Sequence, residues 1–470
     1  MKISSTALYF GSRTVAAIGN LISVAVFTHF IGPEEYGAYV LVFAWVIIVY
    51  GFTTQWMKFA YFGVYRAAQA GALIATYGRL ALGVVAVASA AIAVTAMLTP
   101  MGGAFAAALV ALFAGMTIYE AATEISRTRL QAGAVALCMV LRAAFVLALG
   151  AATLSVWPSA IALALAVAAG HLLAAVPSLI SLRGFARAQP SREEARGLVR
   201  YGWPLIFSFG ITALGFTTDR LIIAYFAGNA VLGPYGVVAD LMRQSFMVAG
   251  ESIALALVTI AKQQADEGRR AQSDATMRLA FRACVTAAAF GAAFFIIFGE
   301  KLVAILLGEG FAQPAYEIIP WIACAFFFMT IRVFYFSQVI YFIDATVIDP
   351  IVNVFFVVVS VVIALVLVPR AGAAGGAAAL AIAHAGACVV AAFAGRRYYK
   401  LPVERAALFG IPALALLALA GAWGLSSALD GAALWAGEIA LFAAAALVAA
   451  WRFDLFSLVI VGAGRQRAAS

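Results

Sequence analysis

Long apolar runs, separated by short polar segments, follow one another along the whole chain. Each run is about as long as the ~20 helical residues that cross a ~30 Å hydrocarbon layer. A transmembrane β-barrel would instead show ~10-residue segments of alternating polarity. The pattern predicts an all-α polytopic membrane protein with about fourteen transmembrane helices. The expected spans are 9–30, 36–57, 79–99, 103–122, 133–156, 158–182, 203–226, 232–258, 282–307, 316–342, 346–368, 372–394, 405–428 and 432–451.

Composition supports this class. Apolar residues make up 65% of the chain and charged residues 11%, whereas a soluble domain carries about 25% charged residues. A water-soluble fold would expose large apolar patches, which soluble proteins rarely tolerate. The first run lacks the pattern of a cleaved secretory signal, so we interpret it as a retained span.

The basic residues predict the topology. The formal net charge is +9. If the N-terminus is cytoplasmic, most of the Lys and Arg residues fall in loops on the cytoplasmic side, and only Lys301 and Arg370 fall in loops on the opposite side. The positive-inside rule therefore predicts that both termini are cytoplasmic. Anionic lipid headgroups, not nucleic acid, account for the basic charge.

No motif of enzyme chemistry is present in the sequence. Nucleotide-binding loops, nucleophile elbows and metalloprotease helices are absent. The three histidines have no partners at metal-ligand spacing, and the four cysteines lie singly in apolar runs, which favours core packing. We therefore expect no enzyme activity, no catalytic residue, no bound metal and no cofactor.

Two predicted outside turns carry the same pattern, F-x-G-x-x-x-x-G-x-Y. The copies are Phe30–Tyr39 and Phe226–Tyr235, 196 residues apart. Six predicted spans separate them, so the two copies have the same orientation. Internal repeats are typical of transporters whose substrate site lies between the halves. The alternative is an ordinary helix hairpin in which glycine ends the first helix.

Several ionisable or polar residues fall inside predicted spans. Such residues cost ~2.5–3.5 kcal/mol at the bilayer centre and usually face a partner or a wet cavity. Asp240 and Arg243 are three residues apart, hence on one helical face. The surplus of arginine suits an anionic substrate, because a guanidinium binds two phosphate oxygens. An ion-pair network between helices is the alternative. The candidate substrate-binding residues are Arg13, Asn20, Asp219, Arg220, Asp240, Arg243 and Arg332.

The turn segments and their neighbours resemble sequences of a known family. Phe30–Tyr39 resembles the first hairpin of polysaccharide and oligosaccharide exporters. The segments Tyr201–Leu205, Thr218–Ile223 and Leu232–Tyr235 are similar to their seventh-span signature. The chain thus resembles the polysaccharide/oligosaccharide flippase branch of the multidrug/oligosaccharidyl-lipid/polysaccharide exporter superfamily. The resemblance covers the first twelve spans, and the last two match only in general character.

This resemblance implies a domain organisation. Two six-helix lobes, 1–182 and 201–395, would form a V-shaped central cavity. A cytoplasmic linker, 183–200, would join them, and 396–470 would add two transmembrane helices and a short cytoplasmic tail. From its residues alone, 192–196 in the linker is expected to form a short interfacial helix. Pro204, Gly210 and Gly215 are candidate bending points of the seventh span or, alternatively, simple packing positions.

The function that the resemblance implies is transport, not enzymatic catalysis. The chain would translocate undecaprenyl-pyrophosphate-linked oligosaccharide across the bacterial inner membrane for exopolysaccharide, capsule or O-antigen synthesis. Its expected partners are the lipid-linked anionic oligosaccharide, membrane lipids and, as a candidate, a polysaccharide polymerase. A lipid II flippase is a close relative that the sequence separates poorly.

Two other functions stay open at this stage. A cation-coupled multidrug exporter of the same superfamily is disfavoured, because such exporters typically need a carboxylate in the first helices and the first two spans of this chain hold none. A membrane polysaccharide polymerase is disfavoured, because the chain has no large extramembrane loop for sugar chemistry.

Overall fold

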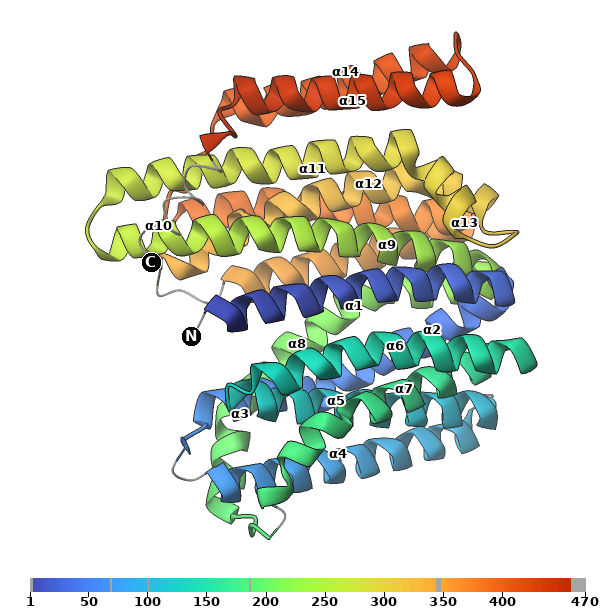
Figure 1. The fold of residues 1–470 in the computed structure, drawn as a ribbon, viewed down its shortest axis with the longest axis vertical. Helices are drawn as coiled ribbons and strands as arrows, with labels where there is room; N and C mark the ends of the chain where they lie inside the picture. The colour runs from blue at the N-terminus through green and yellow to red at the C-terminus, as the bar shows by residue number, and fades with distance from the viewer. Residues whose placement is uncertain (1–2, 68–69, 100, 186, 344–347, 458–470) are drawn as a thin grey trace. The chain divides into compact units, whose positions relative to one another are not determined.

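The computed structural model describes residues 3–67, 70–99, 101–185, 187–343 and 348–457, and this part of the chain is helical without any strand. The elements are α1 (Ile3–Phe30), α2 (Pro33–Thr53), α3 (Gln55–Val64), α4 (Ala70–Leu98), α5 (Gly103–Thr128), α6 (Ala132–Val156), α7 (Ala160–Ser181), the 3₁₀ turn η2 (Arg183–Phe185), α8 (Arg192–Ala227), α9 (Asn229–Ile253), the π-helical η3 (Ala254–Val258), α10 (Thr259–Asp266), α11 (Arg270–Leu306), α12 (Ala312–Phe334), the 3₁₀ helix η4 (Phe336–Tyr341), α13 (Ile348–Arg396), α14 (Arg405–Ser426) and α15 (Gly431–Arg452). Figure 1 labels the α-helices.

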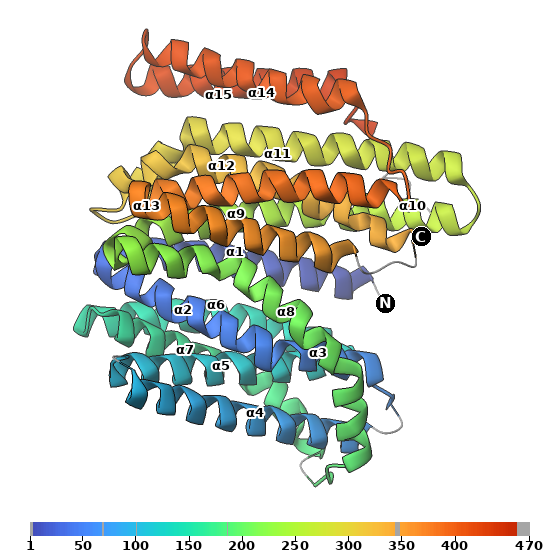
Figure 2. The ribbon, with the colours of Figure 1, turned by 180° about the vertical axis from the view of Figure 1, so that it is seen from behind.

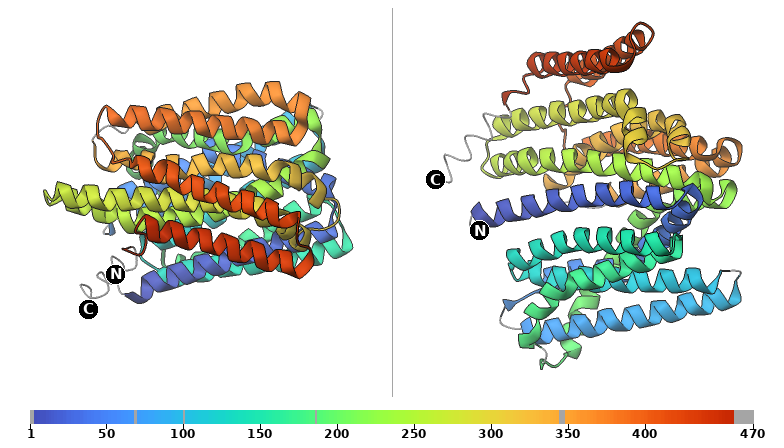
Figure 3. Two further views of the ribbon diagram at one scale, coloured as in Figure 1. Left: turned by 90° about the horizontal axis from the view of Figure 1, so that it is seen from above. Right: turned by 45° about the vertical axis from the view of Figure 1, so that its right-hand side comes forward.

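Thirteen helices in the described part of the chain are long and apolar enough to cross a membrane. One of them, α13, contains two of the predicted spans. Its Gly372 has a non-helical backbone (φ 53°, ψ −129°), and the rings of Phe356 and His384 stack with centroids 4.3 Å apart. Along one straight helix these residues would be ~42 Å apart. The two halves of α13 therefore fold back on each other (Figure 3), and the prediction of about fourteen spans is confirmed.

The chain forms two compact units. Unit 1 contains residues 1–236 and 306–311, and unit 2 contains 237–305 and 312–470. The helices α1–α8 and the first turns of α9 belong to unit 1. This division falls inside α9. The predicted repeat halves, with their linker at 183–200, stay a prediction.

Loops rich in basic residues gather at one end of unit 1. Arg129, which follows α5, donates to the carbonyl of Ser181 (3.4 Å), and its guanidinium lies 4.6 Å from the ring centroid of Phe185. Thr76 of α4 accepts a hydrogen bond from the backbone N–H of Ser191 (2.9 Å). The loops after α3, α5 and α7 therefore share one end, as the predicted alternation of the spans requires.

The predicted short helix at 192–196 is wrong as a separate element. These residues are the first turns of α8, which runs on to Ala227 without a break. Ser191 caps the helix by accepting from the N–H of Glu193 (3.2 Å), and the acidic first turn suits the helix dipole. Pro204 lies inside α8 rather than at its start. Proline removes an internal helix hydrogen bond, and Figure 2 shows that α8 changes direction along its length.

Gly210 of α8 has a packing role. A β-carbon added there would collide with the ring of Phe52 in α2. A β-carbon added at Gly51 of α2 would approach the Ala213 side chain to 2.5 Å. Small residues on both helices thus allow close contact of α2 with α8, as in many membrane helix pairs.

In unit 2 the hairpin α14–α15 packs on α11. Ile411 and Phe453 lie in one apolar cluster with Phe281 and Cys284. At the far end of α11, Lys301 forms an ion pair with Glu438. The helices α14 and α15, which follow the twelfth predicted span, are thus held against α11 by apolar contacts and by an ion pair.

The cysteines largely follow the prediction. Cys138, Cys284 and Cys388 are buried, whereas Cys324 is exposed, so core packing is wrong for Cys324. A membrane helix is apolar on its lipid face as well as on its packed face. Hydropathy therefore cannot distinguish the two faces at a single position.

Candidate functional site

The two copies of the repeated turn contact each other reciprocally in unit 1. A β-carbon added at Gly37 would meet the carbonyl of Asn229 and, at 2.9 Å, the backbone nitrogen of Gly233. A β-carbon added at Gly233 would meet the carbonyl of Pro33 and, at 3.2 Å, the backbone nitrogen of Gly37. Pro33 matches Asn229, and Gly37 matches Gly233, at the same offset of 196 residues. Each glycine therefore packs on the backbone of the other copy, as in a two-fold contact.

Asp219 and Arg220 are both buried on α8, with 7% and 4% of their surfaces exposed. Asp219 accepts a hydrogen bond from the hydroxyl of Tyr235 (2.5 Å). Tyr235 is fully buried and is the last residue of the second repeat copy. The repeated turn therefore positions a carboxylate that was a candidate site residue.

Asp240 and Arg243 form the ion pair that their spacing predicted. Arg243 donates from Nη2 to Oδ1 of Asp240 at 2.6 Å. Both side chains keep about a third of their surface exposed, 38% and 32%. The pair on α9 is therefore not sealed in a core.

Arg332 lies in the interior of unit 2, 5% exposed. Its Nη1 donates to Oδ1 of Asn353 (3.0 Å), and Asn353 donates in turn to Asp349 (3.2 Å). Its guanidinium lies 5.2 Å from the ring centroid of Phe356. These contacts tie α12 to the first half of α13.

The two remaining candidates lie on α1. Arg13 is exposed and Asn20 is half-buried. The structure thus distributes the seven candidates over α1, α8, α9 and α12. Their role in substrate binding stays a prediction.

Sequence reasoning missed a polar cluster in unit 1. Lys58 of α3 forms an ion pair with Glu120 of α5. One turn further along α5, Glu124 is 3% exposed and accepts from Arg127 (2.9 Å) and Thr128 (3.3 Å). The sequence does contain a sign of this cluster: Glu120 falls inside a predicted span, and an ionisable residue inside a span is a candidate functional residue. In this structure Lys58 neutralises Glu120.

A second repeat, not found from the sequence, places an arginine, an aromatic ring and a histidine together in each unit. In unit 1 the Arg142 guanidinium lies 5.8 Å from the ring centroid of Tyr119, which His171 meets edge-on at 5.5 Å. In unit 2 Phe356 carries the stacked ring of His384 and the guanidinium of Arg332. The helices involved are α5, α6 and α7 in unit 1, and α12 and both halves of α13 in unit 2.

Two residues of the group in unit 1 have counterparts in unit 2 at the same distance along the sequence. His171 and His384 lie 213 residues apart, and so do Tyr119 and Arg332. The arginine and the aromatic residue have therefore exchanged helices between the copies. Such cation–π contacts are worth ~0.5–2 kcal/mol, so each group of three stabilises its own helices.

Metal chemistry receives no support from the described residues, since they contain no cluster of three His, Cys, Asp or Glu side chains that could hold an ion. The charged side chains instead form pairs and cation–π contacts. What this arrangement offers chemically is the recognition of a charged or polar solute, chiefly through guanidinium groups.

No family model and no curated protein matches the sequence. Solved structures do resemble this one. A lipid II flippase, MurJ, in an inward closed conformation has a TM-score of 0.74 at 12% identity, covering 97% of this chain and 100% of its own. An inward-facing MATE multidrug resistance transporter of the MOP superfamily has a TM-score of 0.65 at 16% identity, covering 81% of this chain and 94% of its own. A MATE protein in complex with MaD3S has a TM-score of 0.54 at 15% identity, covering 82% of this chain and 95% of its own.

At these identities the likeness shows the fold. The structure has the architecture shared by the MurJ flippase and the MATE transporters. The predicted all-α transporter fold is therefore confirmed, as is the resemblance to this superfamily at the level of the fold.

Proposed function

We propose that the chain is a flippase for a polyprenyl-pyrophosphate-linked oligosaccharide, acting in exopolysaccharide, capsule or O-antigen synthesis at the bacterial inner membrane. The observation that carries this proposal is how much of the chain each similar structure covers. The flippase accounts for 97% of the chain, whereas the MATE structures account for 81–82%. The flippase likeness thus extends over helices that the exporter likeness leaves out.

The distribution of charge supports an anionic substrate. We propose that Arg243 receives the pyrophosphate, because a guanidinium binds two phosphate oxygens. Arg13 is exposed and stays a candidate, whereas Arg220, 4% exposed, is as buried as Arg332. The exposed third of Arg243 supports access for a ligand. For Arg332, near-complete burial beside Asn353 and Phe356 favours the structural alternative.

The direction of transport follows from the proposed topology. The basic loops share one end of unit 1, which supports a cytoplasmic location for that end. The cytoplasmic location of both termini stays a prediction from the distribution of basic residues along the sequence. The saccharide headgroup would enter from this side, because lipid-linked precursors carry it on the cytoplasmic leaflet. It would leave at the end that holds the repeated turns.

A cation-coupled drug exporter remains the second candidate, supported by the MATE likeness. Such an exporter needs a carboxylate that can take up a cation. Glu120 of unit 1 is half-buried but is paired with Lys58, which disfavours that role.

A pair of substitutions tests the proposed phosphate ligand. Arg243→Lys keeps the charge but loses the planar fork, so lipid-linked oligosaccharide should accumulate on the cytoplasmic leaflet. Asp240→Asn keeps the guanidinium and should impair transport less, at matched membrane abundance. If Asp240→Asn is the more damaging change, Arg243 is structural and the phosphate is held elsewhere.

A further inference from the structure

The helix of the eighth predicted span is not regular along its whole length. It consists of α9, the π-helical turn η3 at Ala254–Val258, and α10, which follow one another without a break. A π-helical turn holds one residue more than an α-helical turn, is rare, and is frequent at functional sites. Residues 235–266 contain no proline, so the interruption of the α-helical pattern at η3 has another cause.

Two hydroxyl side chains beside and within η3 bond back to the helix backbone. Ser252 donates to the carbonyl of Val248 (2.7 Å), and Thr259 donates to the carbonyl of Leu255 (3.0 Å). Such bonds compete with the backbone hydrogen bonds of a helix and often bend it. The sequence therefore weakens the α-helix on both sides of the turn.

Hydrogen bonds hold α10, which follows η3, against α11. Ser273 donates to the carbonyl of Ala261 (2.7 Å), and Thr276 donates to the side chain of Gln264 (2.8 Å). Ser273 and Ala261 are both fully buried. Breaking their bond would leave a buried polar group unsatisfied, which is costly. The part of the helix that follows η3 is thus fixed in unit 2.

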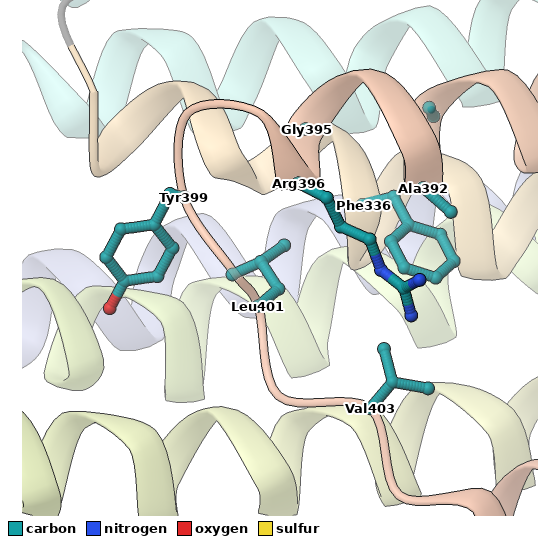
Figure 4. Close-up of a pocket in the computed structure, with 8 residues that line it drawn as sticks. Phe336, Ala392, Gly395, Arg396, Tyr399, Leu401 and Val403 are labelled. Atoms are coloured by element: carbon teal, nitrogen blue, oxygen red, sulfur yellow. The ribbon is translucent and has the colours of Figure 1, made fainter.

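The loop between α13 and α14 braces the same part of unit 2. Tyr335, which lies in one apolar cluster with Val258 of η3, donates from its hydroxyl to the carbonyl of Pro402 in this loop. At the end of the loop, Arg282 of α11 donates twice to Glu404, at 2.6 and 2.8 Å. Figure 4 shows the course of the loop. These bonds make the surroundings of α10 rigid.

Aromatic rings pack against α9, which precedes η3. The ring centroid of Phe246 lies 6.0 Å from that of Phe295 and 5.9 Å from that of Phe326. Phe334 packs on Gly250, where an added β-carbon would collide with its ring. Packed apolar surfaces can slide over each other in small shear movements. These ring contacts are therefore compatible with a bend of the helix at η3.

This helix also belongs to both compact units. Its first turns, up to Gly236, lie in unit 1, and the rest lies in unit 2. Gly233, in the first turns, packs on the backbone of Pro33. A movement of one unit against the other must therefore be absorbed along this helix. Sharp kinks, of more than ~20°, occur at π-helical turns, so η3 is the point where the helix bends most readily.

We propose that η3 is a hinge of the transport cycle. The part of α9 that precedes η3 bends and carries the Asp240–Arg243 pair with it, while α10 stays on α11. The proposal rests on transport and not on the substrate, so it holds for a flippase and for an exporter. Ser245 lies nine residues before Ala254, which is ~14 Å along a helix. A bend of about 20° displaces Ser245 by about 5 Å.

The test measures distances between pairs of spin labels in the full-length protein in proteoliposomes. Labels at Ser245→Cys and Ala275→Cys, both exposed, report on α9 relative to α11. A second pair, Ser245→Cys with the exposed Cys324 of α12, detects a displacement in another direction. Native cysteines that carry no label are replaced. We expect two distance maxima, separated by up to about 5 Å. The control pair, Gln263→Cys with Ala275→Cys, lies beyond η3 and should give a single maximum.

Deletion of Ala256 should remove the hinge. Ala256 is an exposed residue of η3, and its loss turns the π-helical turn into an α-helical turn while both flanking helices keep their packed faces. We expect a single maximum, loss of transport and an unchanged unfolding midpoint. Deletion of Ala287 is the matched control. It lies in α11, where no π-helical turn can absorb the change, so the midpoint should fall.

The double variant Ser252→Ala, Thr259→Ala decides the question if the deletion does not fold. Removing both back-bonds favours the α-helix and should shift the two populations toward one maximum. An unchanged distribution would overturn the proposal, as would two maxima after the deletion or a single maximum in both pairs of the unmodified helix. The distances need no substrate. Two maxima that merge on deletion, in a protein that moves no lipid-linked oligosaccharide, would refute the flippase and leave the hinge standing.

Discussion

Replacing Gly37 by alanine should separate the two copies of the repeated turn. The new β-carbon would lie against the carbonyl of Asn229 and 2.9 Å from the backbone nitrogen of Gly233. Both are backbone atoms of a helix, so neither can move aside alone as the end of a flexible side chain could. The first turns of α9 must shift away from α2.

The size of the effect follows from two opposing terms. Overpacking in a close-packed contact costs ~1–3 kcal/mol, while Gly→Ala in a helix gains ~0.5–1 kcal/mol. A net loss of about 1–2 kcal/mol lowers the unfolding midpoint by roughly 2–8 °C in a unit of this size. Gly233→Ala, which meets Pro33 in the same way, should have a similar effect. The double variant should lose less than the sum, since either change alone opens the contact.

The assay is thermal unfolding in detergent, followed with a thiol-reactive dye. Cys138 and Cys284 are buried and free, so they react when the units unfold, above a background from the exposed Cys324 that the folded protein already gives. Gly83→Ala is the control, because a β-carbon there meets no atom within 4 Å. A midpoint for Gly37→Ala at or above that of Gly83→Ala would refute the reasoning.

Further predictions concern the ion pair in unit 1, the topology and the second repeat. Lys58→Met should lower the unfolding midpoint, because it leaves the half-buried carboxylate of Glu120 without its Lys58 partner, and adding Glu120→Gln should restore most of the loss; an unchanged midpoint in the single variant would contradict this. In a cysteine-free background, a membrane-impermeant maleimide added to intact cells should label Glu309→Cys but not Gln189→Cys, and labelling of both or the reverse order would contradict the topology. Phe356→Leu should destabilise unit 2 by ~1–3 kcal/mol in the same thermal assay, because Arg332 and His384 both pack on its ring, and no change would argue against this contact.

Much of the fold was predictable, because a membrane span is set by length and hydropathy alone. The two spans joined at Gly372 were found from the sequence, even though their helices meet at a single non-helical residue. The error at 192–196 has a physical cause. A polar, charged segment beside a span is compatible with a separate interfacial helix or with an extension of the span, and the choice depends on tertiary contacts such as that of Ser191 with Thr76.

The candidate site was only partly predictable. The spacing of Asp240 and Arg243 fixed their pairing, because residues three apart share a helical face. The bond from Tyr235 to Asp219, and the contact of Gly37 with Asn229, join residues far apart in the chain or on different helices. No local pattern contains that information. The pairing of Glu120 with Lys58 was missed because Lys58 was assigned to a loop, whereas it lies in α3.

The central proposal is tested most directly by translocation in proteoliposomes that contain only this protein. A fluorescent polyprenyl-pyrophosphate-linked oligosaccharide is placed in both leaflets, and the fraction accessible to an external quencher or glycosidase is followed over time. The flippase account predicts that the protected fraction becomes accessible in vesicles with the unmodified protein and remains protected with Arg243→Lys at equal reconstitution. A protected fraction that never becomes accessible, in vesicles that do transport a lipophilic cationic drug against a proton or sodium gradient, would contradict the account and establish the exporter alternative.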